Sequence, residues 1–369
     1  MRAVVLVGGE GTRLRPLTYT MPKPLLPIGN VAFLERQLAW LARHDVDEVV
    51  LSLGYLPDAF VEHFPDGKCG GVRVRYAVEK EPLGTAGGVR YAADQAGIAE
   101  RFVVCNGDVL TELDLSALVR FHDERGADAT IHLTRVPDPS AFGVVPTADD
   151  GEVKAFVEKP PPGRAPTDWI NAGTYVLEPS VLAGIPPGLT VSIERETFPR
   201  MLDHPRHLFA YRSDGYWLDI GTPEKYLEAH SDVLAGRLGP AALPADAVER
   251  APGVWCEGDV TIADEARVEA PVLLGAGSDI RPRSAVARSV LGASCVVEEG
   301  ARVSRSVLLD GARLETDAQA IDSVIGPGAV LEHGAVASDH TIVGAAAVVT
   351  EGSRVAGARL QVPGTPAAR

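Results

Sequence analysis

In the last third of the chain, aliphatic residues recur every six positions. A short fixed period of this kind is typical of a solenoid, in which each coil buries its apolar edge against its neighbours. The repeating positions form five sets of three that begin 17, 18, 16 and 18 residues apart: Leu274, Ile280, Val286; Leu291, Val297, Val303; Leu309, Glu315, Ile321; Ile325, Leu331, Ala337; and Val343, Val349, Val355. Small residues such as Ser278 and Cys295 often follow an aliphatic residue by four positions. Three six-residue steps per turn predict a triangular coil, with Glu315 at an irregular corner; an irregular β-sandwich is the alternative.

Residues 1–230 have a different pattern, in which short apolar runs alternate with helical periods. Asn30 is expected to cap a helix that carries Phe33, Leu34, Leu38 and Leu41 on one face. Strands are expected at 3–7, 48–55, 72–78, 101–105 and 129–136, and helices at 85–96, 115–126 and 222–239, the last joining the two halves. Such alternation predicts an α/β fold with an open, mainly parallel sheet covered on both faces. Ligands of such folds bind beyond the carboxyl ends of the strands.

Length, charge and cysteine content narrow the class of protein. The 369 residues suggest two or three domains. The formal net charge of −15 argues against a nucleic-acid partner, which favours a basic surface. No apolar run approaches a membrane span or a signal peptide, so we expect a soluble, cytoplasmic protein. The four cysteines form no CxxC pair, so we expect neither a structural zinc site nor disulfides.

The string GGEGTRLRPLT follows the first predicted strand. It differs from the dinucleotide fingerprint, because Leu14 stands where the third glycine belongs, and no Gly-Lys-Ser/Thr of a P-loop follows. Arg13 and Lys23 lie in one loop with glycine-freed backbone N–H groups, a combination that suits a polyphosphate. The alternative is a plain tight turn with two solvated cations.

Several further strings follow in a fixed order: PKPLLPIGN, EPLGTAGG (81–88), NGD (106–108), FVEKP (156–160), NAG (171–173) and YWLDIGTPEKY (216–226). With the opening loop, they closely resemble the sugar-nucleotide pyrophosphorylase (nucleotidyltransferase) family over about 230 residues. The six-residue repeat resembles the hexapeptide left-handed β-helix of the long-chain members. The resemblance implies a Rossmann-like nucleotidyltransferase domain at 1–232, a linker at 233–252, a left-handed β-helix at 253–358 and a tail at 359–369.

The reaction that the resemblance implies is attack by a sugar 1-phosphate oxygen on the α-phosphorus of a nucleoside triphosphate, with release of pyrophosphate. Arg13 and Lys23 would grip the leaving pyrophosphate, and Lys159 would hold the sugar 1-phosphate. The implied nucleotide-binding residues are Leu6, Gly8, Gly9, Gly11, Thr12, Gly84, Thr85 and Gly87. The implied sugar-phosphate-binding residues are Gly143, Glu158, Lys159, Asn171 and Gly173. No general base is needed, because the sugar phosphate is already ionised, so direct in-line displacement is expected.

A divalent metal suits a reaction between two polyanions, and Mg²⁺ prefers carboxylate, phosphate and water oxygens. We assign it to Asp108 and Asp219. Each candidate has a simpler alternative. Asn-Gly-Asp is a common turn, and Asp219 could cap the helix that begins near Thr222. Thr85 could likewise be the N-cap of the helix at 85–96.

The loop sequences PKPL (22–25) and PLGTAGG (82–88), together with SIERETFP (192–199), look most like those of mannose-1-phosphate guanylyltransferases with a β-helix tail. GTP and mannose 1-phosphate are therefore the favoured substrates. Glucose-1-phosphate thymidylyl- or uridylyltransferase, or a guanylyltransferase for an unusual sugar or cyclitol phosphate, is the alternative. Two alternatives come from other functional classes. One is an acyltransferase that uses His333 or His340, and the other is a catalytically silent regulatory subunit. A homo-oligomer is expected, since solenoid faces often assemble.

Overall fold

The computed structural model describes residues 1–203, 207–239 and 242–362, and they form two compact units. The sheet unit comprises Met1–Gly9 and Leu34–Trp217, and the solenoid unit comprises Glu10–Phe33 and Leu218–Arg369. Residues 240–241 of the predicted linker and residues 363–369 of the predicted tail lie outside the described residues. No helix within the described ranges is long and apolar enough to cross a membrane.

The sheet unit is built on one mixed sheet of ten strands. The strands of its centre run parallel: β7 (Phe102–Asn106), β1 (Arg2–Leu6), β4 (Glu48–Leu53) and β6 (Val72–Val78). On one side the sheet continues antiparallel with β12 (Trp169–Leu177), β10 (Gly143–Val144) and β11 (Val157–Glu158), and on the other with β5 (Lys68–Cys69). β9 (Ala129–Arg135) branches from β12 and pairs in parallel with β13 (Leu208–Arg212). The five predicted strands are confirmed, and the fold class with them.

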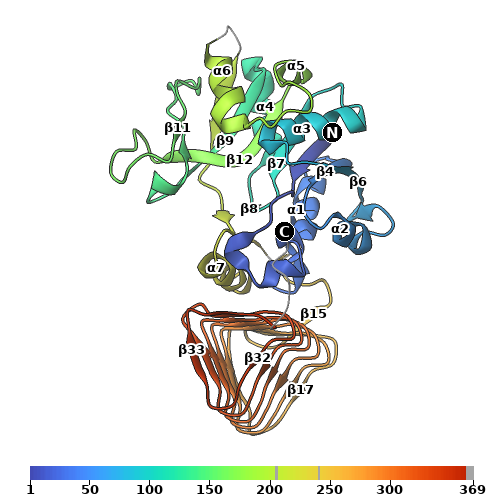
Figure 1. Cartoon of the computed structure of the whole chain (residues 1–369), viewed down its shortest axis with the longest axis vertical. Helices are drawn as coiled ribbons and strands as arrows, with labels where there is room; N and C mark the ends of the chain where they lie inside the picture. Colours follow the sequence, from blue (N-terminus) through green and yellow to red (C-terminus); the bar gives the residue numbers. More distant parts are fainter. Residues whose placement is uncertain (204–206, 240–241, 363–369) are drawn as a thin grey trace. The chain divides into compact units, whose positions relative to one another are not determined.

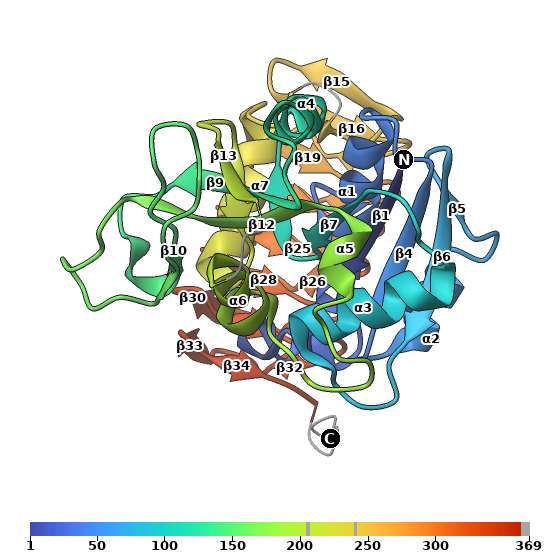
Figure 2. The ribbon, with the colours of Figure 1, turned by 90° about the horizontal axis from the view of Figure 1, so that it is seen from above.

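Helices cover this sheet. α3 (Gly84–Ala96) packs across β1, β4 and β6 (Figure 2), with Ala86, Val89 and Ala93 in the core. α4 (Leu115–Arg125) packs on β9, β12 and β13, and begins at Asp114, whose side chain accepts from the Ala117 N–H. The remaining helices are α1 (Phe33–Ala42), α2 (Pro57–His63), α5 (Pro179–Leu182) and α6 (Phe198–Leu202). The two helices predicted at 85–96 and 115–126 are thereby confirmed.

Asn30 does not cap a helix, so that prediction is wrong. It lies with Gly29 in the turn between β2 (Pro27–Ile28) and β3 (Val31–Ala32), and both residues have positive φ, 60° and 53°. A two-residue hairpin of this twist requires positive φ at both positions, which Asn and Gly tolerate best. The Asn30 Nδ2 donates to the Glu257 carboxylate and to the Leu291 carbonyl at 2.9 Å. Its amide therefore ties the hairpin to the solenoid.

The solenoid has the predicted triangular cross-section (Figure 1). Each of its three faces is a sheet of parallel strands. The first face contains β16 (Val254–Glu257), β19 (Val272–Leu274), β22 (Val290–Leu291), β25 (Val307–Leu308), β28 (Val324–Ile325), β31 (Ile342–Val343) and β34 (Arg359–Leu360), and the second contains β17 (Thr261–Ile262), β20 (Asp279–Ile280), β23 (Val296–Val297), β26 (Arg313–Leu314), β29 (Val330–Leu331) and β32 (Val348–Val349). The third contains β18 (Arg267–Glu269), β21 (Ala285–Ala287), β24 (Arg302–Ser304), β27 (Gln319–Ile321), β30 (Val336–Ser338) and β33 (Arg354–Ala356). β15 (Ala247–Ala251) pairs antiparallel with β16. The arrangement is consistent with the predicted left-handed β-helix.

The third predicted set is out of register by one residue. Leu308, rather than Leu309, pairs with Leu291 and Ile325, and Leu314, rather than Glu315, pairs with Val297 and Leu331. The third member is Ala320 rather than Ile321. In the sequence, the adjacent Leu308 and Leu309 allow the six-residue repeat to start at either position. In the structure, Leu314 and Ala320 are fully buried and Glu315 is half-exposed. The coil therefore has no irregular corner at Glu315.

The helix predicted at 222–239 is confirmed in place but ends earlier. α7 (Pro223–Leu234) begins at Thr222, whose hydroxyl accepts from the Lys225 N–H at 3.4 Å, and is followed by Gly236 at φ 71°. The Tyr226 hydroxyl donates to the Pro27 carbonyl at 2.6 Å. The helix is thus bonded to the β2–β3 hairpin of the same unit.

Candidate active site

The carboxyl ends of three parallel strands in the sheet unit are each followed by glycine. Leu6, Ser52 and Asn106 lie level in register, and Gly8 and Gly107 follow two of these strands. A Cβ at Gly8 would come within 3.3 Å of the Gly54 nitrogen, and one at Gly107 would collide with the Leu6 carbonyl. Gly9 has open space around it. This edge of the sheet, where Leu6, Gly8 and Gly9 were expected to bind nucleotide, exposes backbone that side chains would cover.

The loop that leads into α3 is held by a carboxylate that the sequence analysis did not single out. Glu79 accepts from the Ser52 hydroxyl at 2.6 Å and from the Leu83 N–H at 2.9 Å. Gly84 and Gly87, two expected nucleotide contacts, lie against the chain at 189–191: a Cβ at either position would collide with a carbonyl of Val191 or Leu189. Close approach of these two segments therefore requires both glycines.

Thr85 is not the N-cap of α3, because the helix begins after Leu83 and has no side-chain cap. The Thr85 hydroxyl instead donates to Glu194 Oε2 at 2.8 Å and accepts from the Ile193 N–H at 2.8 Å. The Ser192 hydroxyl donates to the same Glu194 oxygen at 2.9 Å. Thr85 and Ser192 thus fix the π-helical turn η5 (Ile193–Thr197) against α3, an irregularity that is frequent at functional sites.

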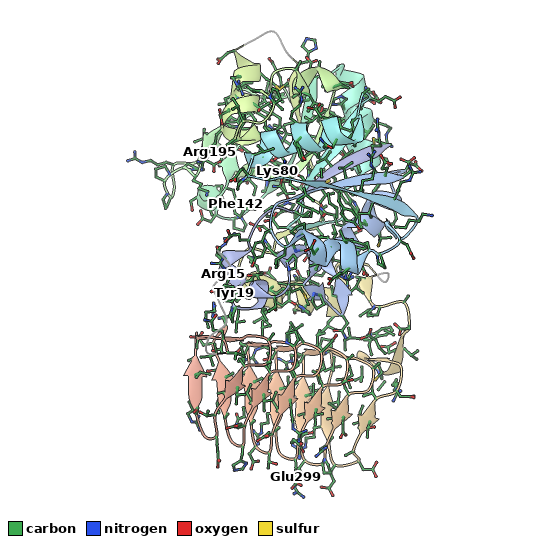
Figure 3. The ribbon with its side chains drawn as sticks, turned by 45° about the vertical axis from the view of Figure 1, so that its right-hand side comes forward. Arg15, Tyr19, Lys80, Phe142, Arg195 and Glu299 are labelled. Atoms are coloured by element: carbon green, nitrogen blue, oxygen red, sulfur yellow. The ribbon has the colours of Figure 1, made fainter. Side chains whose placement is uncertain are left out.

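An open hollow lies in the sheet unit beside this turn. It is lined by Ala141, Phe142, Gly143, Glu158, Lys159, Asn171, Ser192, Glu194 and Arg195. The structure thus brings together four of the five expected sugar-phosphate residues. Glu158 lies opposite Gly143 in the β10–β11 pair, and its Oε2 would be 3.0 Å from a Cβ there. Figure 3 shows Phe142 and Arg195 at the same edge of the unit.

Gly173, the fifth residue, is not among the residues that line the hollow and lies in a bulge of β12. Its φ is 76°, and a Cβ would come within 2.7 Å of the Asn106 amide nitrogen. Glycine is needed there on both counts. The NAG and NGD strings, 65 residues apart in the chain, are therefore in direct contact through Asn106 and Gly173.

The orientation of the Asn171 amide is set by its neighbours. Its Oδ1 accepts from the Gly173 N–H at 3.0 Å, and its Nδ2 donates to the Tyr175 hydroxyl at 2.8 Å. Tyr175 in turn donates to Glu194 Oε1 at 3.5 Å. Burial, with the nearby Glu194 charge, raises the pKa of Tyr175 well above its usual value, so the phenol stays protonated. Asn171 therefore keeps one N–H donor for the hollow, while Glu158 supplies acceptors.

Lys159 ends the short strand β11 in a left-handed conformation, with φ 46°. Its N–H donates to the Phe142 carbonyl at 3.0 Å, and its Nζ lies 4.0 Å from Glu158 Oε1. The Phe142 ring packs edge-on against Trp217, at 5.7 Å between centroids, and the Trp217 Nε1 donates to the Ala172 carbonyl. The hollow thus combines a cation, hydroxyl-binding groups and an aromatic wall.

The expected polyphosphate loop belongs to the solenoid unit. Gly11 has φ 60°, and a Cβ there would come within 3.0 Å of both Lys23 and Thr18. The Thr18 hydroxyl donates to the Gly11 carbonyl at 3.0 Å. Thr12 and Arg13 follow in an exposed helical turn, η1 (Thr12–Leu14). The loop therefore places Lys23 directly beside Gly11.

Two further cations lie in the same loop with different surroundings. Arg15 pairs with Glu10 at 2.6 Å and lies over the Tyr19 ring at 5.1 Å (Figure 3). The Arg13 guanidinium covers Gly221, where a Cβ would collide with it. Arg13 is thus held two residues from Asp219, inside one unit.

The two carboxylates assigned to a metal lie at strand ends. Asp108 is half-buried in the turn between β7 and β8 (Val109–Thr111), and Asp219 ends β14 (Trp217–Asp219). Thr222, not Asp219, caps α7, so the capping alternative is wrong. No three His, Cys, Asp or Glu side chains gather as a metal site within the described ranges. Asp108 belongs to the sheet unit and Asp219 to the solenoid unit, and each offers the hard carboxylate oxygens that Mg²⁺ prefers.

Two family models match the chain: Nucleotidyl transferase over residues 2–236 and GMPPB C-terminal domain over residues 256–363. The chain belongs to the nucleotidyl transferase family. Substrates of this family are a nucleoside triphosphate and a sugar phosphate, and its members generally use a divalent metal.

Relatives within the nucleotidyl transferase family extend over most of the chain. The mannose-1-phosphate guanylyltransferase of Mycobacterium tuberculosis is 40% identical over 296 residues, which cover 78% of this chain and 79% of the relative. The UTP–glucose-1-phosphate uridylyltransferase of a Synechocystis species is 34% identical over 288 residues, covering 74% of each. Among solved structures, HddC from Yersinia pseudotuberculosis complexed with GMP-PN is 31% identical, with a TM-score of 0.54, and covers 63% of this chain and 98% of its own.

Five residues of the hollow were missed by the sequence analysis: Ala141, Phe142, Ser192, Glu194 and Arg195. The last three lie in SIERETFP, which the family resemblance included without a role for any residue. Only the fold brings this string to 158–159, because Arg195 of the turn η5 meets Glu158 of β11, which lies 37 residues earlier in the chain. Phe142 carried no signal, since a lone aromatic before a glycine is an ordinary strand residue.

Proposed function

We propose that this nucleotidyl transferase transfers GMP from GTP to mannose 1-phosphate, giving GDP-mannose and pyrophosphate. The observation that carries the proposal is the hollow of the sheet unit, where Lys159 lies beside Glu158 and the oriented Asn171 amide. A cation next to separate acceptor and donor groups suits a phosphorylated sugar, which presents both charge and hydroxyls. Gly143 and Gly173 belong to the same acceptor site.

In the proposed reaction, Lys159 holds the sugar 1-phosphate so that one of its oxygens faces the α-phosphorus. Positioning of this kind can supply several kcal/mol of a barrier. Arg13 and Lys23 bind the phosphates that leave as pyrophosphate and stabilise the charge that develops there. The α-phosphorus–oxygen bond to the leaving group breaks as the new bond forms, without a covalent enzyme intermediate.

The remaining predicted residues complete the nucleotide side of the proposal. Leu6, Gly8, Gly9, Gly11 and Thr12 receive the triphosphate, and Gly84, Thr85 and Gly87 face the base or ribose. Asp108 and Asp219 hold Mg²⁺, whose chemistry is charge neutralisation on the phosphates. Gly11 lies beside Lys23 within the solenoid unit. Thr85 is hydrogen-bonded to Glu194, which lines the acceptor hollow.

The choice of GTP and mannose 1-phosphate rests on similarity to relatives such as the mannose-1-phosphate guanylyltransferase of Mycobacterium tuberculosis. The alternative is a glucose-1-phosphate uridylyl- or thymidylyltransferase, which the Synechocystis relative favours. A guanylyltransferase for an unusual sugar or cyclitol phosphate is a further alternative. We also propose a cytoplasmic, homo-oligomeric enzyme, since nucleoside triphosphates are cytoplasmic and solenoid faces offer extended contact surfaces.

The experiment that tests the proposal is a matrix of reactions with Mg²⁺. The protein is incubated with each common nucleoside triphosphate and each of a panel of sugar 1-phosphates, and pyrophosphate release is followed. The highest kcat/KM is expected for GTP with mannose 1-phosphate. Release with UTP or dTTP but not GTP would overturn the nucleotide assignment alone, whereas no release with any pair would overturn the enzyme assignment.

A further inference from the structure

The hollow contains a second cation that none of the predicted roles uses. The Arg195 Nη2 lies 3.4 Å from Glu158 Oε1, the same oxygen that lies 4.0 Å from the Lys159 Nζ. Both distances are longer than those of close charge-assisted hydrogen bonds. Two cations therefore converge on one carboxylate oxygen without either forming a tight pair.

This ion pair contributes little to folding. The Arg195 side chain is 64% exposed, and exposed pairs are typically worth ~0–1 kcal/mol. The backbone beneath it is nevertheless held firmly: the Arg195 N–H donates to the Ser192 hydroxyl at 3.2 Å, and the Ser192 N–H donates to Glu196 at 3.0 Å. A side chain with little value for stability is thus carried on a well-fixed turn that also contains Glu194.

The charges of the hollow also favour a role for Arg195 in binding an anionic substrate. Its four charged side chains are Lys159 and Arg195, which are cationic, and Glu158 and Glu194, which are anionic, so the formal charge is zero. Without Arg195 the sum would be −1, and a sugar 1-phosphate dianion would meet net repulsion. Arginine is also the side chain whose planar fork matches phosphate.

We propose that Arg195 binds the phosphate of the sugar 1-phosphate together with Lys159, and that Glu158 holds both cations until the substrate arrives. On binding, the phosphate replaces Glu158 as the partner of the two cations, and Glu158 turns to accept from sugar hydroxyls. No covalent bond changes in this exchange. The inference rests on the proposed function, because it assigns a further residue to the same acceptor site.

The test measures binding separately from turnover. Mannose 1-phosphate is titrated by calorimetry into the full-length wild type, Arg195→Ala, Arg195→Lys and the control Arg200→Ala, an exposed arginine in the same segment outside the hollow. Arg195→Ala should weaken binding about 10- to 100-fold, and Arg195→Lys should weaken it less. The KM for GTP should change less than about twofold, and Arg200→Ala should match the wild type.

Inorganic phosphate gives a second readout, because it carries the charge but no hydroxyls. As a competitor of mannose 1-phosphate, it should bind more weakly to Arg195→Ala and more tightly to Glu158→Gln, since the carboxylate no longer competes for Arg195. Mannose 1-phosphate itself should bind more weakly to Glu158→Gln. If the wild type binds sugar 1-phosphate and Arg195→Ala binds it equally well, the inference is overturned and the proposed function stands. If the wild type neither binds it nor releases pyrophosphate, both are overturned.

Discussion

The buried hydroxyl of Tyr175 offers a sharp test of how the acceptor hollow is organised. Tyr175 is fully buried, and its hydroxyl is the acceptor that orients the Asn171 amide and a donor to Glu194. Tyr175→Phe removes one oxygen and leaves a half-buried amide N–H of Asn171 without that acceptor, which costs about 1–3 kcal/mol. If this cost appears as lost orientation of Asn171, the KM for the sugar 1-phosphate should rise about 5- to 150-fold.

The assay is steady-state pyrophosphate release with each substrate varied in turn. The KM for the nucleotide should be unchanged, because the Thr85–Glu194 bond does not involve Tyr175. The effect should be the same from about pH 6 to 9, because burial raises the pKa of Tyr175 and keeps it neutral throughout. The matched control is Tyr76→Phe, which removes a hydroxyl whose partners among the described residues are the carbonyls of Phe60 and Phe64.

Equal changes in both KM values, or the same change in the Tyr76→Phe control, would contradict this role of Tyr175. Either result would mean that a loss of general stability, rather than a misplaced amide, lowers activity. A double-mutant cycle with Asn171→Ala sharpens the test: once Asn171 is absent, Tyr175→Phe should have little further effect on the KM for sugar 1-phosphate.

Three further perturbations test other parts of the structure. Leu314→Ala should lower the free energy of unfolding by about 2–5 kcal/mol, since it opens a cavity inside the solenoid, whereas Glu315→Ala should change it by less than about 1 kcal/mol; urea unfolding checks both, and the opposite ranking would restore the sequence register. Burial lowers the pKa of His132 to about 3, against about 6.5 when unfolded. The unfolded chain therefore binds a proton that the folded chain excludes, so stability is fully present above about pH 6.5 and falls by about 1.4 kcal/mol per pH unit below it. Because burial also lowers the pKa of His122 and His44, both proteins lose stability on acidification, but urea midpoints between pH 7.5 and 4.5 should fall more steeply for the wild type than for His132→Leu; parallel curves would disprove it. Asp108→Asn should cut turnover by orders of magnitude with an unchanged melting temperature, and near wild-type turnover would remove Asp108 from the metal site.

Periodicity predicted the large features of this fold because burial enforces it. The six-residue period survives in the solenoid, since each coil must bury the same faces, and the alternation of strands and helices survives in the sheet unit. What periodicity could not supply was the phase at Leu308 and Leu309, two apolar residues that fit either register. It also mistook Asn30 for a cap, because hairpin turns and N-caps favour the same residue.

The sequence motifs assigned Glu158, Lys159 and Asn171 to one site, and in the structure these three residues line one hollow. It was missed where the chemistry depends on contacts between segments far apart in the chain. Glu194 acquires its role from Thr85, which lies 109 residues away, and Arg195 acquires its role from Glu158, which lies 37 residues away. Long-range contacts of this kind leave no local signal in one sequence.

The proposed function requires the chain to join a nucleoside monophosphate to a sugar 1-phosphate. Phosphorus NMR of one mixture of protein, GTP, mannose 1-phosphate and Mg²⁺ follows all the phosphates of this reaction at once. We expect the GTP and mannose 1-phosphate signals to decline together, while a sugar-linked diphosphate and free pyrophosphate grow in equal amounts. Conversion of GTP to GDP and phosphate, or an unchanged spectrum with every nucleoside triphosphate and sugar 1-phosphate tried, would contradict it.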